Sequence, residues 1–369
     1  MVRDGRNNPS ARRIFRLGCS CFGSRGLGVI PVRQRFIGLS LAIAAVGFLV
    51  AGCGQTSPSK PITHKKSIKH VVKPKPKPIR YASPTTGMPE KSPGGQFFAV
   101  TVENSPQARP QTGLASADIV YEMETEGTIT RYLALFHDHI PPLIGPVRSA
   151  RPYFVTTAED WGAPFVHFGG SPQAYQMLSN YPYHQIDGVT GAGGKYFSRD
   201  PSRVAPHNAY LHTDRLPTFQ QSVLNGHFKF GQPPLAGTKS VSTLSIVYNS
   251  FTRVKYDYQK GTDEYLRYQD GQPDLDKGTG KQIYTNNVIV QYAPMAPIPN
   301  GTHGHISINL NGPGLALYFT MGKEIAGTWQ RNPSGKVVYY DAQGKMITLH
   351  PGKTWIEVVD DSVPVTETK

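Results

Sequence analysis

Cysteine is scarce in this chain of 369 residues, which contains only Cys19, Cys21 and Cys53. We expect an export signal to be removed just before Cys53, so that the mature chain keeps one cysteine and forms no disulfide. The stability of the mature chain must then come from its apolar core, for which about 290 residues are sufficient. A metal site built from cysteines is excluded in the mature protein.

Acidic residues are scarce in one part of the chain only. Residues 1–80 hold 16 of the 39 Lys and Arg but one of the 25 Asp and Glu, so residues 81–369 hold 23 basic and 24 acidic residues. The formal net charge of +14 therefore belongs to the first 80 residues. Nucleic-acid binding requires a basic face that neutralises phosphates, and we expect no nucleic-acid partner for the folded part.

A long apolar run without charge occurs once, from Phe36 to Cys53, directly after Arg33 and Arg35. A charged segment, an apolar segment and small residues follow one another as in an export signal. Residues 49–53 resemble a bacterial lipobox. We therefore expect a signal peptide at 1–52, a lipid on Cys53, and a mature chain held on the cell membrane and facing outside the cytoplasm. The alternative is an uncleaved transmembrane anchor. The segment before Phe36 is long for a signal, and we expect that the true start codon lies further downstream.

Residues 53–92 are predicted to form a disordered linker. Lys73, Lys75 and Lys77 alternate with proline there, a pattern that favours extended polyproline II and forbids a helix. The simplest interpretation is a solvated spacer between the membrane and the folded part. The alternative is that the lysines also bind anionic lipid or wall polymer.

The residues after the linker show strand and helix patterns in the first half and mainly short strands in the second. Apolar runs predict strands in the first half at 97–102, 118–123, 131–136 and 164–168. Helices are predicted at 149–160, 171–179 and 214–224. Strands interleaved with helices predict a mixed α/β domain at 93–228. Beyond a Pro- and Gly-rich joint, short strands predict a β-rich domain at 240–362 with one short helix near 277–284. The expected fold class is α+β, and no repeat of solenoid or propeller period is visible.

Two arginines are candidate ligand-binding residues. Arg148 and Arg151 lie three residues apart at the opening of a predicted helix, where they would share a face. Guanidinium groups bind carboxylate or phosphate bidentately. The alternative is that they pair with acidic residues across a sheet, with Glu122, Glu124 or Glu126 as partners.

A second candidate lies where a predicted strand meets a predicted helix. Gly169 and Gly170 permit a tight turn, Ser171 is a suitable helix cap, and Pro172 suits the first helical position. The alternatives are ordinary capping and a small anion site at the helix N-terminus, with His167 beside it. His207 and Asn208 lie in a loop, where binding residues concentrate; otherwise the histidine simply holds that loop down.

Catalytic and metal sites have weaker support. A nucleophilic triad would combine Ser149 or Ser171 with His167 or His207 and with Asp118 or Asp187, but a Gly-x-Ser-x-Gly elbow is lacking. Glu122, Glu124 and Glu126 would share a face of one strand as glycosidase carboxylates do, yet they also suit pairing with arginines.

Two histidine pairs are candidate metal ligands. His137 and His139 share a face of an extended chain, whereas Asp138 points to the other face. His303 and His305 lie in a loop. Because no carboxylate stands at ligand spacing, we expect no metal site and no cofactor.

Several longer strings carry a family resemblance. They are residues 103–114, 117–122, 126–131, 145–151, 167–171, 203–208 and 327–329. These strings resemble the YerB-like lipoproteins, a bacterial family known as domain of unknown function 3048. The resemblance implies a two-part, lipid-anchored extracytoplasmic protein without an established activity, and it assigns no catalytic residues.

The sequence thus favours a binding or scaffolding protein of the cell envelope, with a hydrolase of cell-wall polymer as the alternative. The predicted ligand surface consists of polar, Gly-rich motifs from one domain: Arg148, Arg151, His167, Gly169, Gly170, Ser171, His207 and Asn208.

Overall fold

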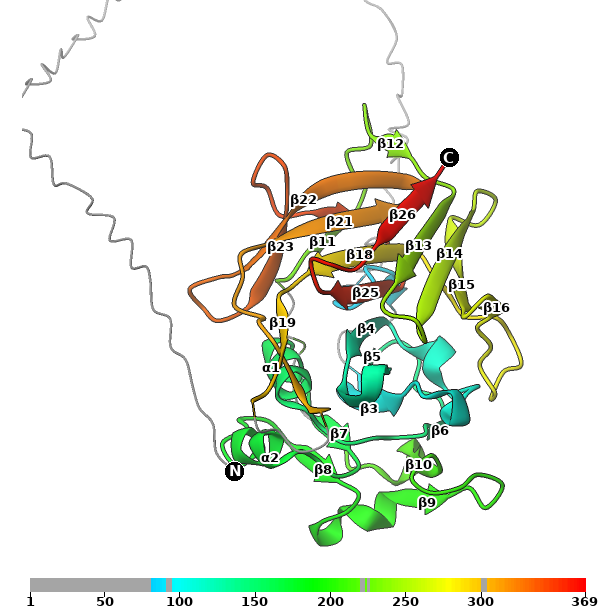
Figure 1. Cartoon of the computed structure of the whole chain (residues 1–369), viewed down its shortest axis with the longest axis vertical. Helices are drawn as coiled ribbons and strands as arrows, with labels where there is room; N and C mark the ends of the chain where they lie inside the picture. Colours follow the sequence, from blue (N-terminus) through cyan, green and yellow to red (C-terminus); the bar gives the residue numbers. More distant parts are fainter. Residues whose placement is uncertain (1–80, 91–94, 220–222, 224–225, 300–303) are drawn as a thin grey trace, which may run out of the picture. The chain divides into compact units, whose positions relative to one another are not determined.

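The computed structural model describes residues 81–90, 95–219, 223, 226–299 and 304–369. Strands predominate in them (Figure 1), and the largest sheet is a central one of eleven strands. In spatial order this sheet contains β12 (Lys239–Ser240), β22 (Lys323–Arg331), β21 (Gly314–Thr320), β18 (Asn287–Tyr292), β25 (Thr354–Val359), β4 (Ile119–Glu124), β5 (Thr130–Phe136), β3 (Phe98–Glu103), β7 (Phe165–His167) and β8 (Gln185–Asp187), with β23 (Val337–Asp341) paired to β22.

The central sheet runs through both halves of the chain. Strand β25, near the C-terminus, lies between β18 and β4 and is parallel to both. Trp355 stands opposite Val288 on one side and Val120 on the other. The two predicted regions are therefore joined by backbone hydrogen bonds within one sheet.

A second sheet and two helices cover the two faces of the central sheet. The second sheet is ordered β16 (Gln272–Pro273), β15 (Glu264–Gln269), β14 (Arg253–Gln259), β13 (Thr243–Val247) and β26 (Val365–Thr368), with β17 (Tyr284–Thr285) paired to β15. Its Tyr256 and Tyr265 share one apolar core with Val120 and Trp355. On the opposite face, α1 (Pro152–Asp160) and α2 (Pro172–Leu178) contribute to a second core.

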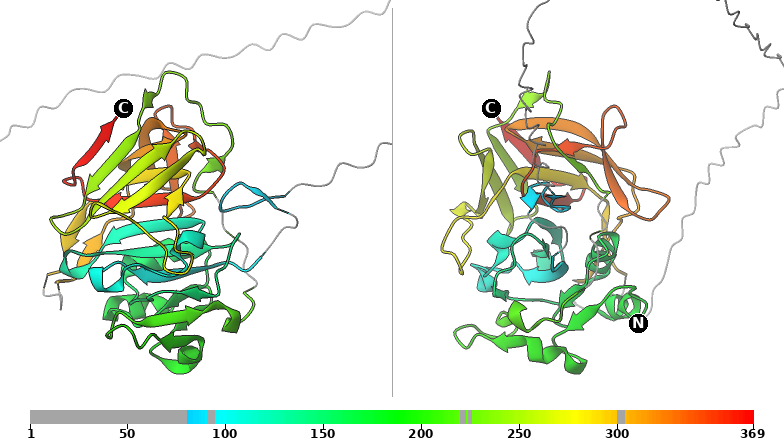
Figure 2. Two further views of the ribbon diagram at one scale, coloured as in Figure 1. Left: turned by 90° about the vertical axis from the view of Figure 1, so that its right-hand side faces the viewer. Right: turned by 180° about the vertical axis from the view of Figure 1, so that it is seen from behind.

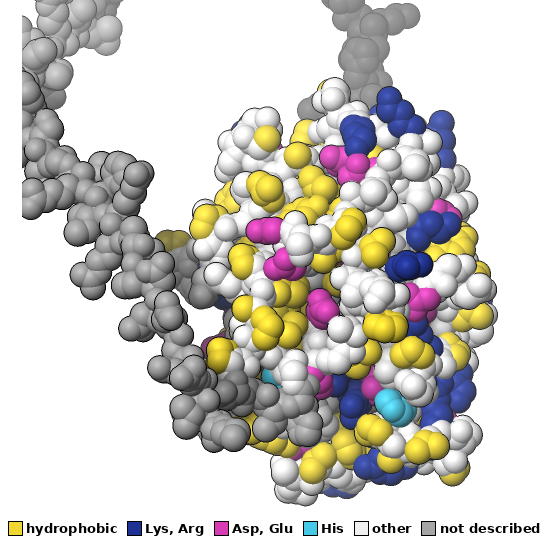
Figure 3. All heavy atoms as spheres, viewed as in Figure 1, with side chains coloured by type: hydrophobic (Ala, Val, Ile, Leu, Met, Phe, Trp, Pro, Cys, Tyr) yellow, Lys and Arg dark blue, Asp and Glu magenta, His cyan; other side chains and the backbone are white. Residues whose placement is uncertain are grey.

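Four small sheets complete the fold. Strands β6 (Leu143–Ile144), β10 (Ala209–His212) and β9 (Phe197–Arg199) form a three-stranded sheet, and Figure 2 shows β3, β4 and β5 between this sheet and the C-terminal strands. The pairs are β1 (Tyr81–Ala82) with β2 (Pro89–Glu90), β11 (Lys229–Phe230) with β24 (Thr348–Leu349), and β19 (Met295–Pro297) with β20 (Ile306–Ile308). Figure 3 shows basic side chains mixed with acidic ones on one face, in agreement with the balanced charge of residues 81–369.

The N-terminal region is not the alternating α/β domain that the sequence predicts, although the β-rich character of the C-terminal region agrees with the expected α+β class. Strand β5 pairs antiparallel with β4 on one side and with β3 on the other, and the connections between these three strands contain only short 3₁₀ turns. At the edge, β7 pairs parallel with β3, and β8 pairs parallel with β7. The reason is that β5 follows β4 after a short connection, which favours antiparallel pairing, so no crossover helix is needed there.

Two predicted helices do not form in the described residues. In the described part of the first, residues 214–219 and 223, there is only a 3₁₀ turn at Thr213–Arg215, and Pro217 follows where a helix would need another N–H donor. The second, at 277–284, is a turn that contains Gly278 and Gly280, and it leads into β17. Glycine costs more conformational entropy in a helix than other residues do, which explains the turn.

Part of the predicted linker forms regular structure. Residues 81–90, assigned above to the linker, form the β1–β2 hairpin. Hydroxyl groups of its loop donate to carboxylates of the central sheet region: Thr85 to Asp118 at 2.9 Å and Thr86 to Asp138 at 2.5 Å. These partners lie far away in the sequence, so the local composition does not reveal them. Cys53 and the Lys-Pro segment lie outside the described residues. In the part that the structure does describe, none of the helices has the length and apolar character needed to span a membrane.

Candidate functional site

A group of charged side chains occupies one end of the central sheet, on the face that carries α1. Along β3 this face presents Ala99, Thr101 and Glu103, so apolar residues give way to polar ones at the end of the strand. Arg131 of β5 stands directly opposite Glu103. We call Thr101, Glu103, Glu126, Arg131, Arg148, Arg151 and His207 the arginine cluster.

Glu103 holds one half of the arginine cluster together. Its carboxylate is fully buried, and its Oε1 accepts from His207 Nδ1 at 3.0 Å and from Ser105 Oγ at 3.0 Å. Arg148 Nε lies 3.2 Å from the same oxygen without the alignment of a hydrogen bond. His207 and Arg148 keep 23% and 20% of their side chains exposed, so this half is open to solvent.

Glu126 holds the other half. Its Oε1 lies 2.6 Å from Arg131 Nη2, and Arg151 donates to both of its oxygens, from Nε at 2.9 Å and from Nη2. Burial alone would raise the pKa of Glu126, but the guanidinium groups of Arg131 and Arg151 outweigh burial and hold this pKa at about 2. Glu126 is therefore an anion at any physiological pH.

Several buried polar atoms of the arginine cluster have no hydrogen-bond partner among the described residues. They are Thr101 Oγ1, Glu103 Oε2, Arg131 Nε, Arg131 Nη1 and Arg148 Nε. Arg131 is only 1% exposed. Leaving a buried polar group unpaired costs about 1–3 kcal/mol, and more for charged groups. The concentration of such atoms in one place is typical of a binding site, where a ligand supplies the missing partners.

The charge of the arginine cluster favours an anionic ligand. Three guanidinium groups face two carboxylates, and His207 adds a further basic group. Burial lowers the pKa of Arg131, Glu126 opposes this effect, and the neighbouring Arg151 and Arg148 lower it further. Because like charges crowd Arg131, an anion placed at its unpartnered nitrogens would relieve repulsion as well as supply hydrogen bonds.

The structure brings part of the predicted ligand surface together. Arg148 and Arg151, however, do not lie on one face of a helix as predicted, because both precede the first residue of α1. Helix α1 begins at Pro152, with Arg151 as its N-cap, and Arg148 lies before it. Arg151 pairs with Glu126, as the alternative interpretation holds. The two predicted motifs do meet, because Ala150 pairs with Gly170 in parallel and Ser171 N donates to Ala150 O.

His167, Gly169, Gly170 and Ser171 have structural partners. His167 is fully buried, with Nδ1 2.8 Å from Gly169 O and Nε2 3.1 Å from Gln185 Oε1. Ser171 Oγ accepts from Ala174 N and caps α2, which confirms ordinary capping. Gly169 has a left-handed φ of +79°, and Gly170 lies against the Tyr175 ring.

Asn208 belongs to the loop and not to the arginine cluster. Its Oδ1 accepts from Arg199 Nη1 at 2.7 Å, and its Nδ2 donates to the carbonyl oxygen of Arg203 at 3.1 Å. Asp187, considered above as a partner of His167, lies 3.8 Å from His167 Nδ1, which is too far for a hydrogen bond. It accepts from Gly169 N and Val189 N and fixes the loop after β8.

Sequence reasoning did not find the residues at the centre of this site. Thr101 and Arg131 were assigned to predicted strands without a role, and Glu103 was placed just beyond one of them, also without a role. Only the register of β3 against β5 shows that Glu103 and Arg131 face each other. The sequence does contain one indication: Glu103 ends one otherwise apolar strand, and Arg131 lies near the start of another. Charged residues at such positions are unusual on a sheet face that a helix covers.

Comparisons with known proteins cover both halves of the chain. Residues 85–224 match the family described as "Protein of unknown function (DUF3048) N-terminal domain", and residues 244–356 match its C-terminal domain. "Putative lipoprotein YerB" of Bacillus subtilis (strain 168) is 33% identical over 334 residues, which are 87% of this chain and 94% of the relative. A crystal structure of the YerB protein from Bacillus subtilis has a TM-score of 0.67 and 32% identity, and the match covers 78% of this chain and 99% of that one.

Proposed function

Since this chain belongs to the DUF3048 family, we propose that it is a lipid-anchored protein outside the cytoplasm that binds an anionic group of the cell envelope through its arginine cluster. The name of its Bacillus subtilis relative supports the lipid anchor. The observation that supports an anionic ligand is that Arg131 is buried and two of its nitrogens have no hydrogen-bond partner among the described residues. The ligand class is a carboxylate or phosphate, which guanidinium groups bind bidentately.

Support for the anchor comes from the apolar run that ends at Cys53. A lipid on Cys53 would hold the mature chain on the membrane, and the following linker would let the folded part reach beyond the lipid surface. Lys73, Lys75 and Lys77 would add attraction to anionic lipid or wall polymer. Cys53→Ala should move the protein from the membrane fraction to the soluble extracytoplasmic fraction. Unchanged retention of Cys53→Ala on the membrane would refute the lipid anchor.

The binding half of the proposal is tested with the full-length chain in detergent and a purified wall-polymer fraction that carries phosphate and carboxylate groups. We compare the wild type with Arg131→Gln and with Arg148→Gln. Each change removes a guanidinium group, and loss of a charge-assisted hydrogen bond of about 1.5–3 kcal/mol weakens binding by roughly 10- to 100-fold. Arg148 is partly exposed, so Arg148→Gln should fold normally even if the buried variant does not.

The matched control is Arg253→Gln, which removes the charge of an exposed arginine in β14. Polymer retention should be unchanged in this variant. Equal losses in all three variants would show that retention depends on overall charge and would refute a specific site. Competition by inorganic phosphate or by acetate then distinguishes the two anion classes.

One observation favours the hydrolase as a second candidate. His207 hydrogen-bonds the buried Glu103 through Nδ1, which is how a carboxylate orients a histidine that acts as a general base. Ser105 contacts the same nitrogen at 3.1 Å, so it does not occupy the position of an activated nucleophile. His167, the other base considered, has contacts at both ring nitrogens. Release of soluble fragments from the polymer, abolished by His207→Ala, would establish a hydrolase and replace the passive binder.

A further inference from the structure

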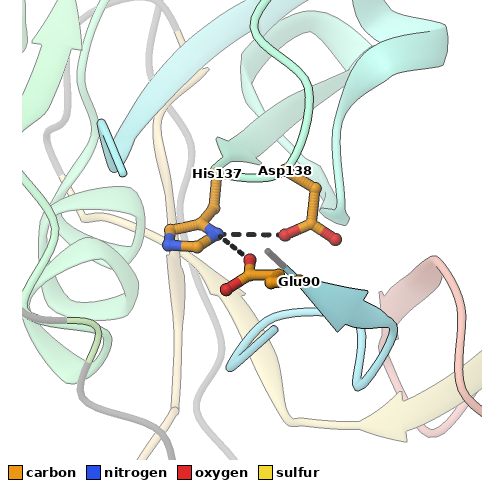
Figure 4. Close-up of side chains that lie close together, drawn as sticks. All are labelled: Glu90, His137 and Asp138. Atoms are coloured by element: carbon orange, nitrogen blue, oxygen red, sulfur yellow. Dashed lines mark hydrogen bonds and ion pairs between the residues drawn. The ribbon is translucent and has the colours of Figure 1, made fainter. Parts of the chain in front are cut away.

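A second group of polar side chains lies where the β1–β2 hairpin meets the end of β5, outside the arginine cluster. It contains Glu90, His137 and Asp138, whose ligand atoms all lie within 4.8 Å of one another. His137 Nδ1 is 3.0 Å from Asp138 Oδ1 and 3.3 Å from Glu90 Oε1 (Figure 4). Two carboxylates therefore converge on a single imidazole nitrogen.

This convergence differs from the arrangement that the sequence predicts. An extended chain would place Asp138 on the face opposite His137. Strand β5, however, ends at Phe136, and residues 137 and 138 lie in a bend, so their side chains turn toward each other. Glu90 comes from the hairpin and is 47 residues away in sequence, which is why spacing alone does not identify it.

Hydrogen bonding alone accounts poorly for the arrangement. One imidazole N–H makes one good hydrogen bond, yet two carboxylate oxygens lie within 3.3 Å of the same nitrogen. The side chains of His137, Glu90 and Asp138 are 5%, 17% and 20% exposed, so water screens the two carboxylates only in part. A cation between the three atoms would remove the repulsion and use every ligand atom.

The three side chains are held in place by other contacts. Asp138 accepts from Ser83 and Thr86 hydroxyls, and its own N–H donates to Asp118 at 2.9 Å. Glu90 lies in β2, opposite Tyr81 of β1. The His137 ring packs edge-on against Phe97, with centroids 6.3 Å apart. Such outer contacts orient ligands before a metal arrives.

Space for further ligands lies beside the group. Glu90, Asp138 and Asp118 line a cavity of about 660 Å³, together with His139, Glu264 and Lys353. A metal held by three protein atoms would complete its shell with water from this cavity.

We propose that Glu90, His137 and Asp138 form a divalent-cation site of the zinc type. One imidazole nitrogen and two carboxylate oxygens match the ligands of Zn²⁺, whereas Ca²⁺ and Mg²⁺ prefer oxygen ligands alone. The site links the β1–β2 hairpin to the end of β5 in the central sheet. The described residues contain no cysteine and therefore no disulfide. A metal bound here would cross-link the β1–β2 hairpin to the end of β5.

The test measures Zn²⁺ binding to the full-length chain in detergent after removal of metal with a chelator. The variants are Glu90→Gln and His137→Gln, each of which removes one ligand, and Glu264→Gln is the matched control because it neutralises another carboxylate of the same cavity. We expect Zn²⁺ to raise the melting temperature of the wild type and of Glu264→Gln by several degrees. We expect at least about tenfold weaker binding in the two ligand variants, and Ca²⁺ to bind at least about tenfold more weakly than Zn²⁺.

Three results would overturn the proposal: no Zn²⁺ binding to the wild type at 100-fold molar excess, the same affinity in Glu90→Gln and His137→Gln as in the wild type, or a loss in Glu264→Gln as large as in the ligand variants. X-ray absorption of the Zn²⁺-loaded wild type needs no variant and decides the matter if the ligand variants fail to fold. One nitrogen with oxygen neighbours supports the site, and a shell that contains sulfur refutes it.

Discussion

Two buried arginines, Arg131 and Arg267, serve different faces of the central sheet. Arg267 is fully buried, and each of its three nitrogens has a partner. Nη2 is 2.5 Å from Glu122 Oε2, Nη1 contacts Asp274 and Gln269, and Nε is 3.2 Å from Tyr256 OH. Its guanidinium also lies 4.5 Å from the Trp355 ring. We call Arg267 with Glu122 and Asp274 the Arg267 network.

Arg131 has one paired nitrogen and two unpartnered ones. The Arg267 network lies between two sheets and joins the N-terminal Glu122 to the C-terminal Arg267, so its charges hold the halves of the chain together. The arginine cluster includes the partly exposed side chains of Arg148 and His207, and several of its charged atoms have no hydrogen-bond partner among the described residues. Complete pairing indicates a structural role, and incomplete pairing of a buried charge indicates a binding role.

The largest effect is expected from Arg267→Met. This change leaves Glu122 and Asp274 buried without their cation, and breaking a buried ion pair in this way costs about 3–5 kcal/mol. Chemical denaturation at neutral pH should show this loss in the free energy of unfolding. Lys255→Met is the matched control, because Lys255 forms a partly exposed pair with Asp257 at 2.6 Å, and it should change stability by less than about 1 kcal/mol.

Arg131→Met should destabilise the protein less, by about 1–2 kcal/mol, because Glu126 keeps Arg151 as a partner. The same variant should lose most of its binding to wall polymer. A denaturation curve and a polymer-retention assay on one preparation give both numbers. A loss of stability equal to that of Arg267→Met, with binding retained, would reverse the roles that we assign to the two arginines.

A rise in pH should lower the free energy of unfolding, because it ionises a buried carboxyl group, that of Glu357, on the face of the central sheet that carries the Arg267 network. Burial, and then the charge of Glu122, raise the pKa of Glu357 from an ordinary 4.5 to about 8. A raised pKa in the folded state contributes stability that is complete below pH 4.5 and is lost as the pH rises through about 8. Stability of the wild type should therefore fall between about pH 4.5 and 8 and then level off with respect to this group. In Glu357→Gln this part of the decline should be absent, and an equally steep decline would contradict the assignment.

Acid pH should weaken the arginine cluster. The pKa of Glu126 lies at about 2, below its ordinary 4.5, so its contribution to stability is complete above pH 4.5 and is lost as the pH falls toward 2. Because the side chain of Glu126 is 16% exposed, we expect a smaller effect than in the fully buried network. Denaturation of the wild type and Glu126→Gln from pH 5 to 2 should show the curves converging. Curves that stay parallel would show that Glu126 carries no such shift.

The sequence predicted local structure better than it predicted partners. Helices α1 and α2 were found to within three residues of their starts; proline at the first helical position marked α2, whereas α1 begins at Pro152, three residues after its predicted start. The cap at Ser171 was likewise local and correct. The strands β3, β4, β5 and β7 were found from their apolar runs, but the antiparallel pairing of β5 with β3 and β4 was not, since nothing in an apolar run specifies its neighbour.

The sites show the same limit. Arg148, Arg151 and His207 were identified because they lie in conspicuous polar motifs, and they do belong to the arginine cluster. Glu103 and Arg131 were missed because each stands within a strand, and only strand register brings them opposite each other. Glu90 was missed because it lay in what looked like linker. Asp138 was assigned to the wrong face because strand alternation was extended two residues beyond the end of β5.

The position of β25 in the central sheet determines when the fold can be completed. This strand is among the last parts of the chain to be synthesised, yet it fills the place between β18 and β4. While the chain is being synthesised, β4 has one edge without a partner until residues 354–359 arrive. Unpaired strand edges invite aggregation and proteolysis. An early lipid attachment would hold each unfinished chain apart from its neighbours during that interval, so the tether would act as a folding aid before it serves as an anchor.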